Sequence, residues 1–480
     1  MKQKIAYVMI LSLCTGSLCG CSLQLPFFDE VENTVISVTE EDPPTLGMTP
    51  SFDYTVQEIM PSVLVDQTGY LPDSDKKAYF LGASVPDEFE VIDMELGACV
   101  YRGRVKSRES NLQSGVYVAY GDFSELQESG EYYIQCKELG YSYGFTISEE
   151  VYHSSITQLY QMLTTQVNAV FEAAHQSDDT YLFTEAQMVS LCDCFQILLQ
   201  TMELFAEDMS GEADGAPDAD GVMTVLAFVR DSVEKMESAP AGSDLSEAYL
   251  AATEAKLAYI YQNINASRAY GYGKNASTRW QTISNRSVGS ADEALTAQLR
   301  LGAAELYRYN NGATYHSYFQ QNVDPNQAQD GSMADFLSRI TYLSTTRKVD
   351  TTLCSSIITT LLRSTEDLSN TAKASPYQIN AEGEGSQQDN ILWNMMILSV
   401  VDYVITNHEY TTVLENHLHY LTGCNELALA KIPLDQTKNA HYYAMQADTA
   451  EIAGSLTQLS QALMMLHALE SAKNTVILES

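Results

Sequence analysis

The chain has 480 residues, with 63 Asp and Glu against 26 Lys and Arg, and its formal net charge at pH 7 is −37. This charge argues against nucleic acid and anionic membrane surfaces as electrostatic partners, and it is compatible with a neutral ligand. Solubility is the simpler explanation of the charge.

The N-terminal segment, residues 1–21, is typical of a bacterial export signal. Lys2 and Lys4 precede a short apolar core, which is too short to be a stable membrane-spanning helix. The core is followed by Leu-Cys-Gly-Cys, which resembles a lipobox ending at Cys21. We therefore expect a lipoprotein on the bacterial cell surface, attached to the membrane by a lipid on Cys21. Secretion after cleavage near Gly20 is the alternative.

Residues 22–58 contain neither Lys nor Arg and show little hydrophobic periodicity. Their composition of Asp, Glu, Pro, Thr and Ser is typical of a chain that does not bury a core. We expect an acidic flexible linker that separates the membrane from the folded part.

Residues 59–150 are predicted to form a small β-sandwich. β-Branched and aromatic residues such as Val63, Tyr79, Val91 and Phe145 gather in short runs, separated at roughly ten-residue intervals by turns that contain Gly, Pro, Asp or Ser. Two cysteines of this segment, Cys99 and Cys136, leave open whether a disulfide joins them.

From residue 151 onward the hydrophobic period becomes helical. Ile156, Leu159, Tyr160 and Leu163 illustrate the spacing, which recurs in long amphipathic segments up to the C-terminus. Residues 151–480 are therefore predicted to be an all-α domain of paired helices, arranged as a toroid or a solenoid. Its cysteines show no zinc-binding spacing and are interpreted as buried small residues.

The motifs of the sandwich resemble those of the N-terminal immunoglobulin-like domain of glycoside hydrolase family 9, the cellulase and endoglucanase family. An early Asn/Asp-Gln-x-Gly-Tyr of that family matches Asp66–Tyr70. An Asp-Phe-Ser and a Gly-x-Tyr match Asp122–Ser124 and Gly130–Tyr132, and a Phe-x-Ile matches Phe145–Ile147.

The helical domain resembles the same family, with its landmarks in family order. They are Asp214–Asp218, Ala303–Arg308 and Leu418–Asn425. The resemblance covers about residues 60 to 470. It implies an N-terminal immunoglobulin-like β-sandwich followed by an (α/α)6 toroid, with any chemistry in the toroid. For Ala303–Tyr307, helix packing alone explains the residue pattern better than the family resemblance does.

The resemblance also implies where two catalytic carboxyl groups should lie, because inverting glycosidases pair a general acid with a general base. The family's Asp-Ala-Gly-Asp base motif is missing from residues 175–187, where Glu185 is the nearest carboxylate. Asp448 falls where the family has the Glu that acts as the general acid. Simpler roles are favoured for both residues: the first turn of a helix for Glu185, and the N-cap of the final helix for Asp448.

Sugar-binding clefts use flat aromatic side chains. Trp280 lies in a polar stretch and is a candidate exposed platform, together with Tyr442 and Tyr443. Trp393 lies in an apolar helical segment and is expected in the core.

No cofactor is expected. Asp214, Asp218 and Asp220 supply oxygen atoms that a structural calcium ion could use, with a solvated loop as the favoured alternative.

These observations predict a cell-surface lipoprotein that resembles family 9 cellulases. We expect a degenerate member that binds β-glucan or another polysaccharide rather than hydrolysing it efficiently. One alternative is an active glycosidase or endoglucanase with altered catalytic carboxylates. The other is a structural or assembly lipoprotein with no glycan ligand.

Overall fold

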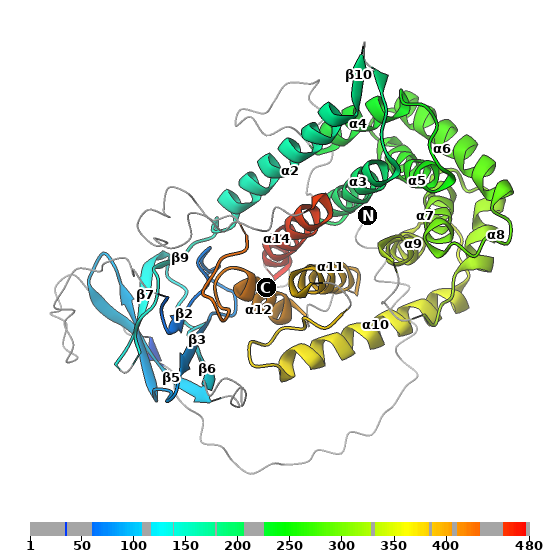
Figure 1. Cartoon of the computed structure of the whole chain (residues 1–480). Helices are drawn as coiled ribbons and strands as arrows, with labels where there is room; N and C mark the ends of the chain where they lie inside the picture. Colours follow the sequence, from blue (N-terminus) through cyan, green and yellow to red (C-terminus); the bar gives the residue numbers. More distant parts are fainter. Residues whose placement is uncertain are drawn as a thin grey trace.

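The computed structural model describes residues 34–35, 60–107, 117–137, 139–177, 180–205, 225–327, 332–383, 386–405, 410–432 and 455–476. A strand-rich unit is followed by a helical unit, and the two lie against each other (Figure 1).

The strand-rich unit is an antiparallel β-sandwich. Its strands are β2 (Val63–Leu64), β3 (Lys77–Gly82), β4 (Glu88–Asp93), β5 (Ala98–Ser107), β6 (Tyr117–Asp122), β7 (Gly130–Cys136), β8 (Gly140–Tyr141) and β9 (Phe145–Ile147). The strand order is β2-β3-β6-β5-β4-β7-β8, with β9 also paired to β7. The long strand β5 pairs with β4 along most of its length and with β6 near its end, so it joins the two sheets. The predicted sandwich is confirmed.

Phe89 fills the centre of this sandwich, and two glycines make room for it. A Cβ atom on Gly103 would lie 2.5 Å from the Phe89 ring, and one on Gly121 would lie 2.3 Å from it. The ring also packs against Phe80, with 5.5 Å between the ring centroids. A side chain at either glycine would therefore displace the largest apolar group of this core.

The expected linker contributes one element to the sandwich. Thr34 and Val35 form β1, which pairs antiparallel with Arg102 and Tyr101 of β5. The two sandwich cysteines that could have formed a disulfide, Cys99 and Cys136, are not joined in one.

The helical unit has twelve helices among the residues that the structure describes, arranged as six consecutive pairs. They are α2 (His153–Ala174), α3 (Glu185–Phe205), α4 (Val225–Glu237), α5 (Asp244–Tyr261), α6 (Ala266–Arg286), α7 (Glu293–Asn310), α8 (Ala313–Asn322), α9 (Met333–Ser344), α10 (Thr351–Ala374), α11 (Gln387–Ile405), α12 (Thr411–Leu421) and α14 (Leu456–Val476).

The second helix of each pair lies inside and the first lies outside, as Figure 1 shows for α2, α4, α6, α8 and α10. Helix α3 packs against both α5 and α14, so the first inner helix meets the last one and closes the ring. This arrangement confirms the expected (α/α)6 toroid.

Burial follows the two layers. The outer helix α10 buries a single stripe that includes Ile357, Leu361 and Thr365, at the spacing of one helix face. The inner helix α3 is long and apolar enough to cross a membrane by composition alone, but most of it is buried inside the toroid. Its hydrophobicity is therefore explained by its place in the inner ring.

A cluster of four charged side chains lies near the C-terminal ends of α3, α5 and α7. Arg308 donates to both carboxylate oxygens of Glu203, at 2.6 and 3.0 Å, and it also pairs with Glu305. Lys256 pairs with Glu203 and lies 3.6 Å from Glu305. The two positive and two negative charges balance. Burial disfavours the charged form of Glu203, but Arg308 and Lys256 hold its pKa below the usual range.

This cluster gives a specific role to the Ala303–Arg308 segment. Glu305 accepts a hydrogen bond from Thr341 of α9 at 3.0 Å, and the Arg308 guanidinium lies 3.8 Å from the centroid of the Tyr259 ring. Four inner helices are therefore connected through one buried polar network. The alanines of the segment serve packing, whereas Glu305 and Arg308 serve this network.

The sandwich and the toroid are joined by a buried ion pair between Asp66 and His419. The Nδ1 atom of His419 lies 2.8 Å from Oδ2 of Asp66, and its Nε2 atom lies 3.0 Å from the carbonyl oxygen of Asp75. Both ring nitrogens of His419 therefore contact oxygen atoms of the sandwich, and Asp66 is the acidic partner of the imidazole.

Neighbouring backbone groups extend the contact. The Gln67 amide nitrogen donates to the Thr422 carbonyl at 2.8 Å, and its side chain donates to the Ala428 carbonyl at 2.7 Å. Gly423 has φ +134°, and a Cβ atom there would lie 2.4 Å from the Gln67 side chain. The segments Asp66–Tyr70 and Leu418–Asn425, which carry the family resemblance in each domain, are thus the two sides of one interface.

Glu415, one helical turn before His419, is the other acidic group of this interface. It accepts a hydrogen bond from the Asp75 backbone nitrogen at 3.2 Å. Burial raises the pKa of Glu415 to about 7, although the nearby His419 charge acts in the opposite direction.

Replacing His419 by Leu should lower the free energy of unfolding by about 3–5 kcal/mol, because Asp66 would stay buried without its charged partner. Differential scanning calorimetry measures the change. The control is His153→Leu at an exposed position, which should change stability by less than about 0.5 kcal/mol. Equal stability of the two variants would contradict the importance of this ion pair.

Replacing Arg308 by Met should also cost about 3–5 kcal/mol, because Glu203 and Glu305 would lose their shared partner in the interior. Urea unfolding followed by circular dichroism tests this. Arg286, whose pairing with Asp244 is solvent-exposed, provides the matched control. Its Met variant should lose less than about 1 kcal/mol. A small effect at Arg308 would mean that the network is dispensable.

The raised pKa of Glu415 predicts a pH effect on stability. The folded protein binds a proton on the Glu415 carboxyl group more tightly than the unfolded chain does. The resulting contribution to the free energy of unfolding is therefore complete below about pH 4.5 and is lost as the pH rises through about 7. The loss is about 3 kcal/mol at most. Unfolding experiments from pH 5 to pH 8 should therefore show a smaller decline for Glu415→Gln than for the wild type. Parallel curves would refute this assignment.

Candidate functional site

The connections that lead from each outer helix to the next inner helix lie at one end of the toroid, where the inner helices begin. The first of these connections contains a short hairpin, β10 (His175–Ser177) paired with β11 (Thr180–Tyr181). The hairpin projects beyond the helices in Figure 1. It lies within residues 175–187, the region where the resemblance places the catalytic base.

Glu185, the candidate base, is the first residue of α3 and is exposed. The preceding Thr184 forms a reciprocal cap with Gln187: the Thr184 backbone nitrogen donates to Oε1 of Gln187 at 2.8 Å, and the Gln187 nitrogen donates to Oγ1 of Thr184 at 3.2 Å. This cap explains why the helix begins here. The first-turn role predicted for Glu185 is confirmed.

Several predicted site residues lie outside the described residues: Cys21, Asp214, Asp218, Asp220, Tyr442, Tyr443 and Asp448. The N-cap role expected for Asp448 is nevertheless corrected. The final helix α14 begins at Leu456, and the side chain of Ser455 accepts a hydrogen bond from the Gln458 nitrogen at 3.2 Å. Ser455 is therefore the cap of this helix.

Trp280 is not an exposed platform, and that prediction is wrong. Its side chain is buried, its Nε1 donates to the Leu299 carbonyl at 2.8 Å, and Tyr315 and Tyr318 pack edge-on against it. The surrounding polar stretch forms α6, whose inward face carries small and aromatic residues at helical spacing. The polar residues lie on the outward face. Trp393 is half-buried and packs against the core.

The hairpin carries an aromatic cluster that the sequence analysis missed. The rings of Tyr181 and Phe183 are nearly parallel, at 12° with centroids 5.8 Å apart, and Phe171 of α2 meets both edge-on. His175 packs against Tyr181. Leu182, which lies between Tyr181 and Phe183 in the sequence, is 58% exposed. Tyr181 and Phe183 themselves are half-buried. We call Phe171, His175, Tyr181 and Phe183 the hairpin cluster.

A second group lies on the inner helices, about one to three turns from the helix starts. It consists of Asp193 and Gln196 of α3, Tyr249 of α5 and Gln298 of α7, and we call it the Asp193 cluster. Asp193 and Tyr249 are partly exposed, whereas the two glutamines are buried. Burial raises the pKa of Asp193 to about 7, and a hydrogen bond from the Tyr249 hydroxyl opposes the rise only in part.

The two buried glutamines are incompletely hydrogen-bonded. Gln196 Nε2 donates at long distance to the Thr253 hydroxyl and to Gln298 Oε1, both at 3.3 Å. Oε1 of Gln196 and Nε2 of Gln298 have no hydrogen-bond partner. Each of these two buried atoms therefore carries a cost in free energy.

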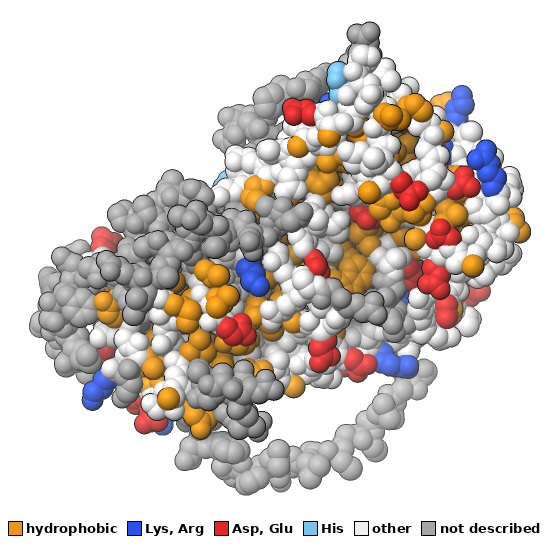
Figure 2. Space-filling model, viewed as in Figure 1, with side chains coloured by type: hydrophobic (Ala, Val, Ile, Leu, Met, Phe, Trp, Pro, Cys, Tyr) orange, Lys and Arg blue, Asp and Glu red, His pale blue; other side chains and the backbone are white. Residues whose placement is uncertain are grey.

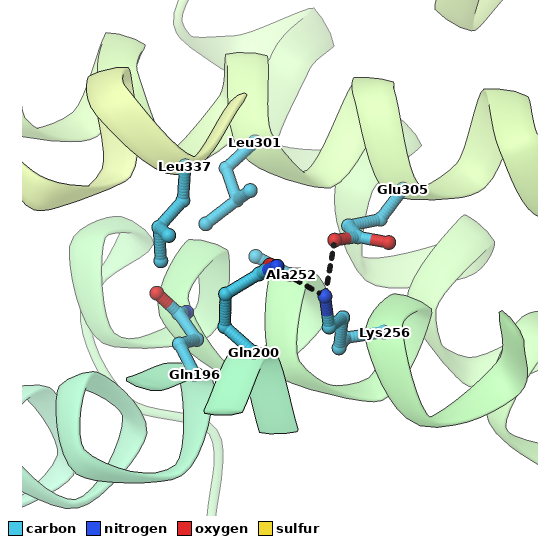
Figure 3. Close-up of a pocket in the computed structure, with 7 residues that line it drawn as sticks. All are labelled: Gln196, Gln200, Ala252, Lys256, Leu301, Glu305 and Leu337. Atoms are coloured by element: carbon cyan, nitrogen blue, oxygen red, sulfur yellow. Dashed lines mark hydrogen bonds and ion pairs between the residues drawn. The ribbon is translucent and has the colours of Figure 1, made fainter. Parts of the chain in front are cut away.

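Below these glutamines is a cavity of about 10 Å³. It is lined by Gln196, Gln200, Ala252, Lys256, Leu301, Glu305 and Leu337 (Figure 3). Figure 3 shows Lys256 reaching toward both Glu305 and Gln200. A cavity of this size holds at most one water molecule. It therefore does not itself accommodate a ligand.

Together these groups can bind a neutral polar molecule. The hairpin cluster offers aromatic rings, and the Asp193 cluster offers polar side chains with one carboxyl group whose pKa is raised by burial. Among the described residues no group of three or more His, Cys, Asp or Glu side chains is placed to hold a metal ion.

Comparison with known proteins identifies the architecture. The family model of the cellulase N-terminal ig-like domain matches residues 58–141. No curated protein sequence shows significant similarity to the chain.

Solved structures extend the likeness to both domains. A metagenome-derived glycoside hydrolase family 9 endoglucanase has 16% sequence identity and a TM-score of 0.67, with 85% of this chain and 99% of that chain covered. A Bacteroides ovatus GH9 protein has 13% identity and a TM-score of 0.64, with 86% and 99% covered. AaCel9A in complex with cellobiose-like isofagomine has 15% identity and a TM-score of 0.65, with 85% and 99% covered.

The family model accounts for the sandwich and the structural matches account for the sandwich and the toroid together. In fold, the chain is a glycoside hydrolase family 9-like protein, in which a cellulase N-terminal ig-like domain precedes an (α/α)6 toroid.

Proposed function

We propose that this protein is a cell-surface lipoprotein that binds a polysaccharide, with β-glucan as the first candidate, and that it hydrolyses its ligand poorly or not at all. The lipid anchor is assigned to Cys21 from the sequence of the export signal. The glycan assignment is supported by the fold, because a structure of similar fold holds cellobiose-like isofagomine.

The observation that carries the binding role is the hairpin cluster. The half-buried rings of Tyr181 and Phe183 are nearly parallel, and the exposed Leu182 lies between them in the sequence. Sugar rings present C–H faces that pack on aromatic rings, while their hydroxyl groups remain hydrogen-bonded at the edges. The hairpin thus supplies a binding surface in the segment where the resemblance would place a catalytic loop.

The case against efficient hydrolysis rests on Glu185. Glu185 is exposed in the capped first turn of α3, a position that the start of the helix explains without a catalytic role. Asp448 remains the candidate acid by sequence position alone.

Residual hydrolysis is the second candidate function, and Asp193 is the observation that favours it. A carboxyl group whose pKa burial raises to about 7 is suited to general acid catalysis at neutral pH. A structural or assembly role without a glycan ligand is the third candidate and predicts no oligosaccharide binding.

The test uses residues 22–480 with cello-, xylo- and manno-oligosaccharides, measured by isothermal titration calorimetry and by release of reducing ends. We expect binding without measurable turnover. Tyr181→Ala and Phe183→Ala should each weaken binding about 5- to 10-fold, because each removes one ring from the platform.

Leu96→Ala is the control, because Leu96 is an exposed apolar residue of the sandwich and its loss should leave binding unchanged. Turnover that disappears in Asp448→Ala would overturn the non-hydrolytic part of the proposal. Failure of the wild type to bind any oligosaccharide would favour the structural or assembly role.

A further inference from the structure

We propose that Glu237 and Glu254 share one proton, and that this proton joins the C-terminal end of the outer helix α4 to the inner helix α5 in a contact that weakens as the pH rises. Glu237 is the last residue of α4, and Glu254 lies inside α5. The inference concerns the wall of the toroid, so it does not depend on the proposed glycan binding.

The Glu254 carboxyl group is completely buried, and its two oxygen atoms have different surroundings. Oε1 accepts a hydrogen bond from Nε of Arg279 in α6 at 3.2 Å. Oε2 has no hydrogen-bond partner among the described residues, although Glu254 is 0% exposed. An unmet acceptor is costly in the interior, whereas protonation turns the same oxygen into a donor.

The acceptor for this proton is the carboxyl group of Glu237. The two carboxyl groups lie within hydrogen-bonding reach of each other where α4 packs against α5. Glu237 is half-buried, and its Oε1 atom accepts from Nδ2 of Asn275 in α6 at 3.1 Å. Two ionised carboxylates this close would repel each other, and one shared proton converts the repulsion into a hydrogen bond. Because Glu254 is the more buried of the two, the proton belongs on Glu254.

The balance of charge also favours a shared proton. Arg279 pairs with both Glu247 and Glu254 of α5, so one guanidinium group serves a cluster of three carboxyl groups that includes Glu237. Burial raises the pKa of Glu254 well above its usual range, Arg279 acts in the opposite direction, and the nearby Glu237 adds to the rise.

Two neutral groups and one further carboxyl group complete the surroundings of the pair. Burial raises the pKa of the Cys192 thiol, which faces Glu254 from α3, and that of the Tyr272 hydroxyl of α6. This hydroxyl donates to Glu234, an exposed residue of α4, at 3.3 Å. On α7, Arg300 and Arg308 are paired with carboxylates outside this cluster. Arg279 is therefore the guanidinium group on which the pair depends.

The shared proton makes the contact sensitive to alkaline pH. The folded protein binds this proton more tightly than the unfolded chain, in which the Glu254 carboxyl group titrates near pH 4.5. The stabilising contribution is therefore complete below that pH, and it decreases as the pH rises toward the higher pKa of the folded state. Once Glu254 is ionised, Glu237 repels it, and the end of α4 separates from α5 more readily.

The test compares the thermal unfolding of residues 22–480 at pH 5.5 and at pH 8.5. Glu254→Gln mimics the protonated group, because its amide oxygen can accept from Arg279 while its amide nitrogen donates to Glu237. Between the two pH values, the melting temperature of the wild type should fall by about 3 °C more than that of Glu254→Gln. Glu237→Gln should also reduce the fall, since its amide offers a donor to the ionised Glu254.

Glu247→Gln is the matched control. It removes a carboxyl group from the same guanidinium group and leaves the pair in place, so it should keep the wild-type fall. Two readouts locate the effect. At pH 8.5, amide hydrogen exchange in residues 233–237, corrected for intrinsic rates, should be faster in the wild type than in Glu254→Gln. The infrared difference spectrum of the two proteins at pH 6.5 should contain the C=O band of a protonated carboxyl group.

The shared proton is overturned if Glu254→Gln and Glu237→Gln both keep the wild-type fall, or if the carboxyl band is missing from the difference spectrum. An equal reduction of the fall in Glu247→Gln would also overturn it, because the effect would then belong to the charge around Arg279. If Glu254→Gln does not fold, Glu237→Gln and the loss of the wild-type carboxyl band with rising pH decide the question.

Discussion

The ion pair between Asp66 and His419 is the contact on which the arrangement of the two domains depends. It is completely buried, and each ring nitrogen of His419 has a separate acceptor on the sandwich. Since a buried polar ring loses free energy when either partner is removed, these two contacts hold α12 in one position against the sandwich. Helix α12 in turn packs against α14, whose contact with α3 closes the inner ring. The sandwich thereby supports the part of the ring where α14, the last inner helix in the sequence, meets α3.

Buried charges of the toroid occur near both ends of the inner helices. Four charges neutralise one another near the C-terminal ends of α3, α5 and α7, beside a cavity for one water molecule. Nearer the opposite end, Asp335 in the first turn of α9 pairs with Arg300 and Arg339. On the face shown in Figure 2, side chains of both charges reach the surface.

Much of the fold could be predicted from the sequence, because the change from short alternating strands to helical periodicity at about Tyr152 is strong. The contact between Asp66 and His419 could not, since 353 positions separate the two residues and no local pattern reports such a pairing. Trp280 was misplaced because the composition of its stretch was considered without its period, and helical spacing turns the ring inward. The hairpin cluster was missed because three-residue and two-residue strands leave almost no periodic signal. Asp193 was overlooked because its chemistry arises from burial, which one helix sequence does not reveal.

The cysteines have a consequence for how the molecule's internal motions can be observed. Cys136 lies in the sandwich, Cys192 and Cys194 in the inner ring, and Cys424 at the interface between the domains, all of them as buried free thiols. A buried thiol reacts with a labelling reagent only while its surroundings are open, so its labelling rate reports local unfolding. The protein therefore carries native reporters in three separate regions. Their relative rates would show whether the interface opens by itself or only together with the domains it joins.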